Sequence, residues 1–207
     1  MNLSKDLINN LKKLQFSELS LRKVEIFKNL LLQFNKSYNL ISKSSEKIVD
    51  NRHILDSAQI VKYINFKSEN SLSDFGTGGG FPGILLAIYN NNPKFHVKLH
   101  EKSKVKCDFL KKCIKNLRIK ATVVHGNLQY QNISSYYITC RAFKKLPDLL
   151  RISREITKKP HRIIILKGKS SQADVDKALK GSIYRYRIEK SITNIESKIL
   201  ILDAKKK

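Results

Sequence analysis

The segment Ser73–Gly83 reads SDFGTGGGFPG and holds five of the eight glycines in this 207-residue chain. It follows a short apolar run that predicts a strand, Leu72–Phe75, and it opens an apolar stretch that predicts a helix, Gly83–Asn90. Glycines this dense indicate a backbone that turns sharply and approaches something closely. The spacing GxGxxG, which between a strand and a helix is typical of a cofactor loop, is met by Gly78, Gly80 and Gly83.

Asp74 distinguishes between the cofactors that such a loop can bind. It lies two residues before Gly76, where a dinucleotide would bring a pyrophosphate that a carboxylate repels. S-adenosylmethionine has no phosphate, and an acidic residue attracts its positive sulfonium and ammonium groups. Glu101, which ends the second predicted strand, fits either cofactor because a carboxylate there can bind ribose hydroxyls. The pattern therefore favours S-adenosylmethionine; an ordinary tight turn is the structural alternative.

Strand and helix patterns alternate from Leu72 onward, which predicts a doubly wound, parallel α/β sheet. The expected helices are Gly83–Asn90, Lys104–Asn116 and Leu146–Thr157. The expected strands are Leu72–Phe75, Phe95–His100, Ala121–Val124, Tyr136–Cys140, Arg162–Leu166, Ile183–Ile188 and Lys198–Leu202. The last two have a short connection and are expected to close the sheet as an antiparallel hairpin.

Residues 1–65 predict an N-terminal helical extension, with apolar side chains at helical spacing from Leu3 to about Ile64. A break is expected at Ser42–Ser45, then one helix over Glu46–Ile64 and a polar linker over Asn65–Ser71. Residues 66–207 are expected to form one compact cofactor-binding domain that ends in a frayed basic tail, Lys205–Lys207.

The chain carries 41 Lys and Arg against 17 Asp and Glu, a formal net charge of +24. This surplus favours RNA or DNA bound through phosphates. The alternative is compositional, because Lys, Asn and Ile are abundant and solvated lysines alone would raise the charge. The sequence has no run of roughly eighteen apolar residues, so we expect no membrane span, and the charged N-terminus does not resemble a signal peptide.

The three cysteines, Cys107, Cys113 and Cys140, form no CxxC pair. Their number and spacing favour free thiols in a reducing cytoplasm over a disulfide framework or a zinc site. We therefore expect a cytoplasmic protein without a metal, and a monomer.

Several segments occur in the order and spacing of one known family. They are FNKSYNLIS (Phe34–Ser42), RHILDS (Arg52–Ser57), DFGTGGGFPGILLAI (Asp74–Ile88), CRAFKKL (Cys140–Leu146) and LKG (Leu166–Gly168). Over nearly its whole length the chain resembles the RsmG family, also called glucose-inhibited division protein B. The resemblance implies a Rossmann-like class I methyltransferase that uses S-adenosylmethionine, with a seven-stranded sheet and an N-terminal helical extension. It also implies a bacterial cytoplasmic enzyme that methylates N7 of one guanine in the decoding-region (530) loop of 16S rRNA.

The resemblance also implies which residues contact the cofactor. Together with the GxGxxG spacing, it gives the cofactor-binding set Gly76, Gly78, Phe81, Glu101, Leu128, Gln129 and Arg141. Three positions depart from the family: Gln129 where an acidic residue is frequent, Tyr136 where Asp is common, and Cys140 where Ser is common. These departures bear on cofactor affinity more than on the class of reaction.

Guanine N7 carries a lone pair and no proton, so its methylation needs no general base and depends on in-line positioning. Arg141 is the leading catalytic candidate because it lies at the carboxyl edge of the sheet and can hold a carboxylate or the RNA backbone. His53 is a second, weaker candidate beside the cofactor or the guanine. Arg52 and Lys167 are expected to contact RNA, although Arg52 can instead pair with Asp56 at i,i+4.

Three other readings stay open on the sequence. Cys140 could attack a pyrimidine ring as a nucleophile, or be a small buried thiol that replaces Ser. The whole chain could be a basic RNA-binding or ribosome-assembly factor with a vestigial methyltransferase fold. It could also be an NAD(P)-dependent oxidoreductase.

Overall fold

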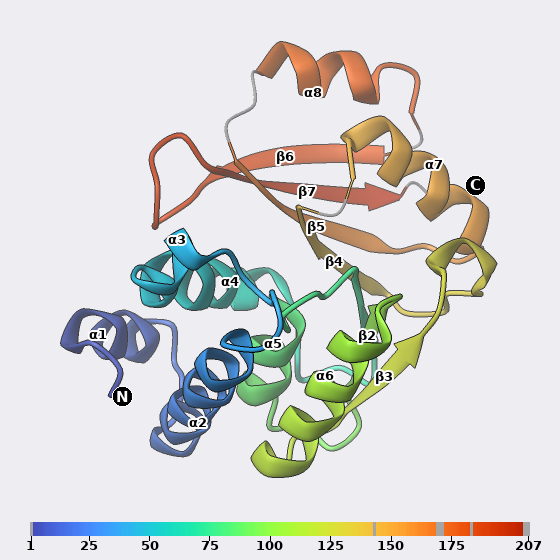
Figure 1. Cartoon of the computed structure of the whole chain (residues 1–207). Helices are drawn as coiled ribbons and strands as arrows, with labels where there is room; N and C mark the ends of the chain where they lie inside the picture. The colour runs from blue at the N-terminus through green and yellow to red at the C-terminus, as the bar shows by residue number, and fades with distance from the viewer. Residues whose placement is uncertain (1, 143, 169–171, 183, 205–207) are drawn as a thin grey trace.

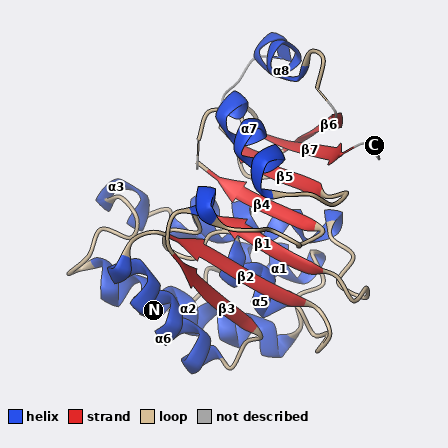
Figure 2. Ribbon diagram, turned by 90° about the vertical axis from the view of Figure 1, so that its right-hand side faces the viewer, coloured by secondary structure: helices blue, strands red, loops and turns tan. Residues whose placement is uncertain are grey.

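The fold is that of a computed structural model, which describes residues 2–142, 144–168, 172–182 and 184–204. A seven-stranded sheet crosses the molecule in the order β3-β2-β1-β4-β5-β7-β6 (Figures 1 and 2). The strands are β1 (Ser71–Phe75), β2 (His96–Glu101), β3 (Ala121–His125), β4 (Tyr137–Arg141), β5 (Arg162–Lys167), β6 (Tyr184–Lys190) and β7 (Lys198–Ala204). β7 pairs antiparallel with both β5 and β6, and the other neighbours pair parallel. The expected sheet and its closing hairpin are confirmed.

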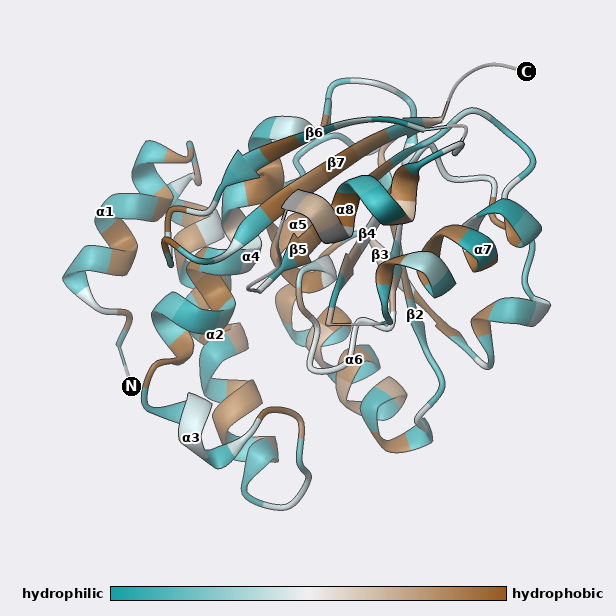
Figure 3. Cartoon of the chain, turned by 90° about the horizontal axis from the view of Figure 1, so that it is seen from above, coloured by the Kyte–Doolittle hydropathy of each residue, from teal (hydrophilic) through white to brown (hydrophobic). Residues whose placement is uncertain are grey.

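The neighbouring strands β5 and β7 are apolar on both faces, so helices must cover both sides. Alternate residues of β5 and β7, such as Ile164 and Ile201, join the core that includes α5, α6 and the N-terminal helices. Their neighbours, such as Ile165 and Leu200, join a second core under α7 and α8. Figure 3 shows these strands as brown bands. The two cores hold the carboxyl edge of the sheet rigidly in place.

Helices lie on both faces of the sheet (Figure 1). They are α1 (Lys5–Lys13), α2 (Glu18–Asn35), α3 (Lys43–Glu46), α4 (Asp56–Ala58), α5 (Gly83–Tyr89), α6 (Lys104–Leu117), α7 (Leu146–Ile156) and α8 (Gln172–Leu179). Serine hydroxyls cap several of them: Ser17 accepts from the Ser20 N–H at the start of α2, and Ser103 caps α6. α8 was not expected.

The segment Glu46–Ile64 was expected to be one continuous helix. That prediction is wrong, because the hydrogen-bonding pattern of the helix changes along the segment. The chain forms a π-helical turn over Asp50–Leu55, then α4, then a 3₁₀ turn over Gln59–Tyr63. π-helical turns widen a helix and are frequent at functional sites. Here the turn provides the Arg52 carbonyl and His53 Nδ1, which accept hydrogen bonds from Arg141 at the end of β4.

The N-terminal helices share one hydrophobic core with the sheet, since Leu7, Phe27 and Leu31 belong to the same buried cluster as Leu99. The boundary between residues 1–65 and 66–207 stays a prediction. Of the other expected features, the tail Lys205–Lys207 and the first residue of the strand Ile183–Ile188 lie outside the described residues. In the described part of the chain, no helix is long and apolar enough to cross a membrane.

Candidate active site

The glycine loop connects β1 to α5 at the carboxyl edge of the sheet. Gly76 and Gly78 have φ values of 67° and 57°, in the region that glycine adopts without strain. Gly83 is required for space instead: a Cβ there would lie 2.3 Å from Leu99 Cδ2 and 2.7 Å from Asp74 Oδ2. The glycines therefore serve both the turn and the close packing of α5 on β1 and β2.

Asp74 lies inside the fold and is not exposed at the surface. Its Oδ2 accepts the Gly83 N–H at 2.9 Å, and its Oδ1 accepts the Thr139 hydroxyl at 2.9 Å. The side chain is fully buried, and this burial raises the pKa of Asp74 to about 6 despite those hydrogen bonds. The sequence argument that Asp74 attracts a positive cofactor directly is therefore wrong; its carboxyl group fixes the loop. The Gly83 N–H is likewise already occupied.

Glu101, the last residue of β2, is nearly buried and is organised by backbone N–H groups. Its Oε2 accepts from Gly78 at 3.0 Å, and its Oε1 accepts from Lys102 and Ser103 at 2.9 Å. A carboxylate that accepts several backbone hydrogen bonds is held in one orientation. Glu101 thus joins the glycine loop to the end of β2.

A cleft of about 450 Å³ opens beside this loop and is called here the glycine-loop cleft. Five of the predicted cofactor residues line it: Gly76, Gly78, Glu101, Leu128 and Gln129. Leu128 and Gln129 lie on a 3₁₀ turn after β3, Leu128–Tyr130, where Leu128 is buried and Gln129 is exposed. Three lysines that the sequence did not single out, Lys102, Lys106 and Lys144, also line it. The cleft volume is within the range of small-molecule sites.

Arg141 is the last residue of β4, not the residue after it, and all three of its guanidinium nitrogens are used. Nε donates to Asp56 Oδ2 at 3.0 Å, Nη1 to His53 Nδ1 at 3.0 Å, and Nη2 to the Arg52 carbonyl at 2.8 Å. The three acceptors come from the π-helical turn and the first residue of α4. Arg141 therefore fastens β4 to the N-terminal extension, and Asp56 is its acidic partner.

The hydrogen bond from Arg141 determines which ring nitrogen of His53 carries the proton. A guanidinium only donates hydrogen bonds, so the Nδ1 atom that faces Arg141 accepts and the ring proton lies on Nε2. Burial, followed by the charges of Arg141 and Arg52, lowers the pKa of His53 to about 4. His53 is therefore neutral near pH 7. Within the described residues its Nε2 has no hydrogen-bond partner.

A second cleft, of about 690 Å³, lies over these groups and is called here the Arg141 cleft. It is lined by Arg52, His53, Asp56, Arg141, Lys167 and parts of the loop between β6 and β7. Ala142 and Lys144 line both clefts, so the two adjoin. The structure thus gathers the predicted catalytic and RNA-binding residues in one cleft and most of the predicted cofactor residues in the next.

Two of the predicted cofactor residues, Arg141 and Phe81, do not line the glycine-loop cleft. Arg141 lines the adjoining Arg141 cleft, and its contact with the cofactor stays a prediction. Phe81 is buried, and its ring packs against the rings of His53 and Phe27, with centroids 5.1 and 5.3 Å away. Cys140 is buried in β4, and burial raises the pKa of its thiol far above the usual range, which argues against a nucleophile.

Sequence reasoning gave Asp56 only a pairing with Arg52, and it missed the loop between β6 and β7 altogether. The signal for Asp56 was its place in RHILDS, one helical turn after His53. The loop, which contains Thr193 and Asn194, has no such motif. Among the described residues, no group of three or more His, Cys, Asp or Glu side chains is arranged to hold a metal ion.

Several solved structures that share this fold are described as methyltransferases, some of them dependent on S-adenosylmethionine. Magnesium protoporphyrin IX methyltransferase from Synechocystis PCC 6803, with bound S-adenosylmethionine, is similar to this chain with a TM-score of 0.63 and 14% identity. That likeness covers 86% of this chain and 97% of the other. A methyltransferase from Aquifex aeolicus matches with a TM-score of 0.60 and 14% identity over 79% of this chain and 98% of the other. At such identities the likeness shows the fold.

The sequence comparisons are more specific. The family model described as rRNA small subunit methyltransferase G matches residues 20–202. A protein of that name from Rickettsia bellii is 37% identical over 180 residues, which cover 87% of this chain and 91% of the relative. One from Pelagibacter ubique is 33% identical over 188 residues, 88% of each chain.

Fold, cleft and relatives together define the class: the chain is a Rossmann-like methyltransferase that uses S-adenosylmethionine. Within that class, it belongs to the rRNA small subunit methyltransferase G family.

Proposed function

We propose that the chain transfers the methyl group of S-adenosylmethionine to N7 of a guanine in the decoding-region (530) loop of 16S rRNA. The observation that carries this proposal is that the two clefts meet at Ala142 and Lys144. A cofactor in the glycine-loop cleft would then present its methyl group toward a base in the Arg141 cleft. The names of the relatives support small-subunit rRNA as the substrate.

We assign cofactor binding to the predicted residues that line the glycine-loop cleft. In this assignment Glu101 accepts hydrogen bonds from the ribose hydroxyls, and Leu128 and Gln129 contact the adenine. Gln129 offers an amide where a carboxylate is frequent in the family, so it can still accept one hydrogen bond from the adenine edge. Phe81, which belongs to the glycine loop, does not contact the cofactor in this assignment; its ring packs against the ring of His53.

In the Arg141 cleft, this chain's residues position the base and do not deprotonate it. N7 already has its lone pair, and the neutral His53 keeps its proton on a buried Nε2, so it takes no proton from the base and instead supports the cleft wall beside Arg141. Arg141 orients His53 through Nδ1. Arg52 and Lys167 line the same cleft and supply positive charge for RNA phosphates. The reaction then depends on proximity and alignment.

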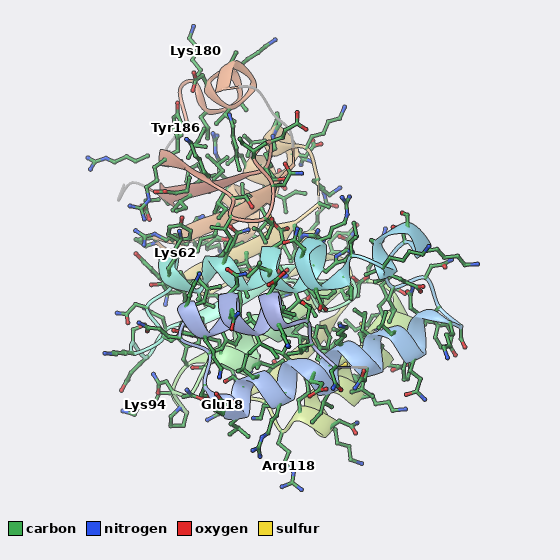
Figure 4. All side chains as sticks on the ribbon, turned by 90° about the vertical axis from the view of Figure 1, so that its left-hand side faces the viewer. Glu18, Lys62, Lys94, Arg118, Lys180 and Tyr186 are labelled. Carbon is green, nitrogen blue, oxygen red and sulfur yellow. The ribbon has the colours of Figure 1, made fainter. Side chains whose placement is uncertain are left out.

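The surface charge supports a polyanion substrate. Figure 4 labels Lys62, Lys94, Arg118 and Lys180, whose side chains project from the body of the molecule. With a net charge of +24, electrostatic attraction would bring RNA to the clefts from a distance. We expect a monomer that acts in the cytoplasm on the small ribosomal subunit.

The proposal is tested by incubating the protein with labelled S-adenosylmethionine and small subunits from a strain that lacks the modification. The rRNA is then digested to nucleosides. We expect the label in 7-methylguanosine; label in another nucleoside would refute the N7 assignment. Calorimetry with S-adenosylhomocysteine separates this function from that of a non-catalytic assembly factor, for which no binding near micromolar concentration is expected. A titration with NADH should show no binding.

A further inference from the structure

Asp56 lies where three parts of the chain meet. Its Oδ2 accepts from Arg141 Nε at 3.0 Å, and its Oδ1 accepts from Thr193 Oγ1 at 2.9 Å and from Gln59 Nε2 at 3.0 Å. The side chains of Asp56 and Arg141 are only 15% and 20% exposed. One carboxylate therefore joins the end of β4, the N-terminal extension and the loop between β6 and β7.

That loop is attached to the N-terminal extension by more than one bond. Gln59, which is buried, accepts from the Ile192 N–H at 2.9 Å and donates to Ser191 Oγ at 3.0 Å. Asn51 donates to the Thr193 carbonyl at 3.3 Å. The partners are more than 130 residues apart in the sequence, so folding alone brings them together. Thr193 and its neighbours Asn194, Glu196 and Ser197 then form one wall of the Arg141 cleft.

Arg141 belongs to another wall of the same cleft. The guanidinium is held on one side by Asp56 and on the other by His53 and the Arg52 carbonyl. If the Asp56 carboxylate were lost, Arg141 would keep two neutral acceptors and could rotate. The hydroxyl of Thr193 would also lose its charged acceptor. A single side chain thus contacts two walls of the cleft and is the charged partner in both.

We propose that Asp56 is a positioning residue for methyl transfer: its carboxylate fixes Arg141 and the β6–β7 loop on two walls of the Arg141 cleft. This inference rests on the proposed function, since it assumes that the acceptor base binds there. A partly buried ion pair contributes little net stability compared with apolar groups of the same size, so stability does not account for the arrangement. The positioning of groups around the acceptor base accounts for it, because a small misplacement of groups around a reacting atom can cost about 100-fold in rate.

The test compares Asp56→Asn with wild type in steady-state methyl transfer to unmodified small subunits. Asn keeps an oxygen for Thr193 but places an amide toward Arg141 Nε. We expect kcat to fall about 100-fold, with the KM for S-adenosylmethionine and the Kd for S-adenosylhomocysteine within about 3-fold of wild type. Thr193→Val removes the hydroxyl that contacts Asp56 and Ser191 and leaves the Arg141–Asp56 pair in place. It should raise the KM for the small subunit by about 5-fold, a shift that a purely stabilising role would not produce.

The matched control is Asp203→Asn, which removes the carboxylate of another Arg–Asp ion pair, the one between β5 and β7. Asp203 receives two hydrogen bonds from Arg162 at 2.6 and 3.1 Å and lines neither cleft. Its kcat should stay within about 2-fold of wild type. Wild-type kcat in Asp56→Asn would overturn the proposal, as would a loss of activity matched by equal losses of cofactor binding and thermal stability. Wild-type protein that fails to methylate guanine N7 would instead overturn the proposed function.

Discussion

The carboxyl group of Asp74 accepts the backbone N–H of Gly83 at 2.9 Å, which ties the end of β1 to the first residue of α5 across the glycine loop. The second oxygen accepts the hydroxyl of Thr139, the residue that faces Asp74 in the register of β1 and β4. Asp74 thus shapes the loop from inside the fold. Its contribution to cofactor binding is the conformation of the loop and not a charge beside the ligand.

This burial predicts a pH-dependent stability. Because the pKa of Asp74 is raised from 3.8 to about 6, the protonated form stabilises the fold below pH 3.8, and this stabilisation is lost as the pH rises through about 6. The difference corresponds to about 3 kcal/mol. Asp74→Asn keeps an acceptor for Gly83 and does not titrate. Urea unfolding at a series of pH values should therefore show wild type losing stability relative to Asp74→Asn between roughly pH 4 and 6. Parallel curves for the two proteins would contradict the assignment.

Gly83→Ala should damage the fold at the loop. A methyl group there would meet Leu99 Cδ2 at 2.3 Å and Asp74 Oδ2 at 2.7 Å, which are side-chain atoms of β2 and β1. We expect a loss of about 1–3 kcal/mol in the free energy of unfolding, and weaker binding of S-adenosylhomocysteine. Gly168→Ala is the control for stability, since nothing lies within 4 Å of a Cβ at that position. Equal unfolding midpoints for the two variants would show that the close packing of Gly83 against Leu99 and Asp74 does not contribute to stability.

Glu101→Gln tests the ribose contact. Both oxygens of Glu101 accept hydrogen bonds from backbone N–H groups. In Gln an NH₂ group replaces one oxygen, so two hydrogen-bond donors would face each other. Calorimetry should show at least about 10-fold weaker binding of S-adenosylhomocysteine. Glu69→Gln, on an exposed pair with Lys94, should bind as wild type does. If Glu101→Gln also bound as wild type does, the cofactor would have to lie elsewhere.

Arg141→Ala should lose about 100-fold in kcat while it stays folded, because Asp56 keeps its hydrogen bonds from Gln59 and Thr193. Circular dichroism and thermal unfolding would check the fold beside the methyl-transfer assay. Arg151→Ala, which removes an exposed i,i+4 partner of Glu155 on α7, is the matched control and should be fully active. Wild-type turnover from Arg141→Ala would remove Arg141 from the site.

Much of the fold followed from the sequence because its signals are local. Each expected strand from Leu72 onward exists to within a residue or two where the structure describes it, and the short connection between β6 and β7 did indicate an antiparallel hairpin. α8 was missed although signals were present. Val175 and Leu179 are buried at i,i+4, and Gly181, with φ 69°, follows the helix where glycine is typical.

The site was predictable only in part, because its contacts join distant parts of the chain. The strand ends and the glycine spacing singled out Gly76, Gly78 and Glu101, and these residues line one cleft. The roles of Asp74 and Asp56 depend on partners 65, 85 and 137 residues away, which only the sheet register and the folded N-terminal extension bring close. Periodicity and spacing carry no information about such pairs.

The most direct test of the central claim is to locate the methyl group in the rRNA. Unmodified small subunits are incubated with the protein and S-adenosylmethionine, and the rRNA is then treated with borohydride and aniline, which cleave the chain at N7-methylguanine. Primer extension across the 530 loop should stop at one guanine, and the stop should be absent without the cofactor. Full-length extension through that loop, or a stop at a guanine elsewhere, would contradict the account.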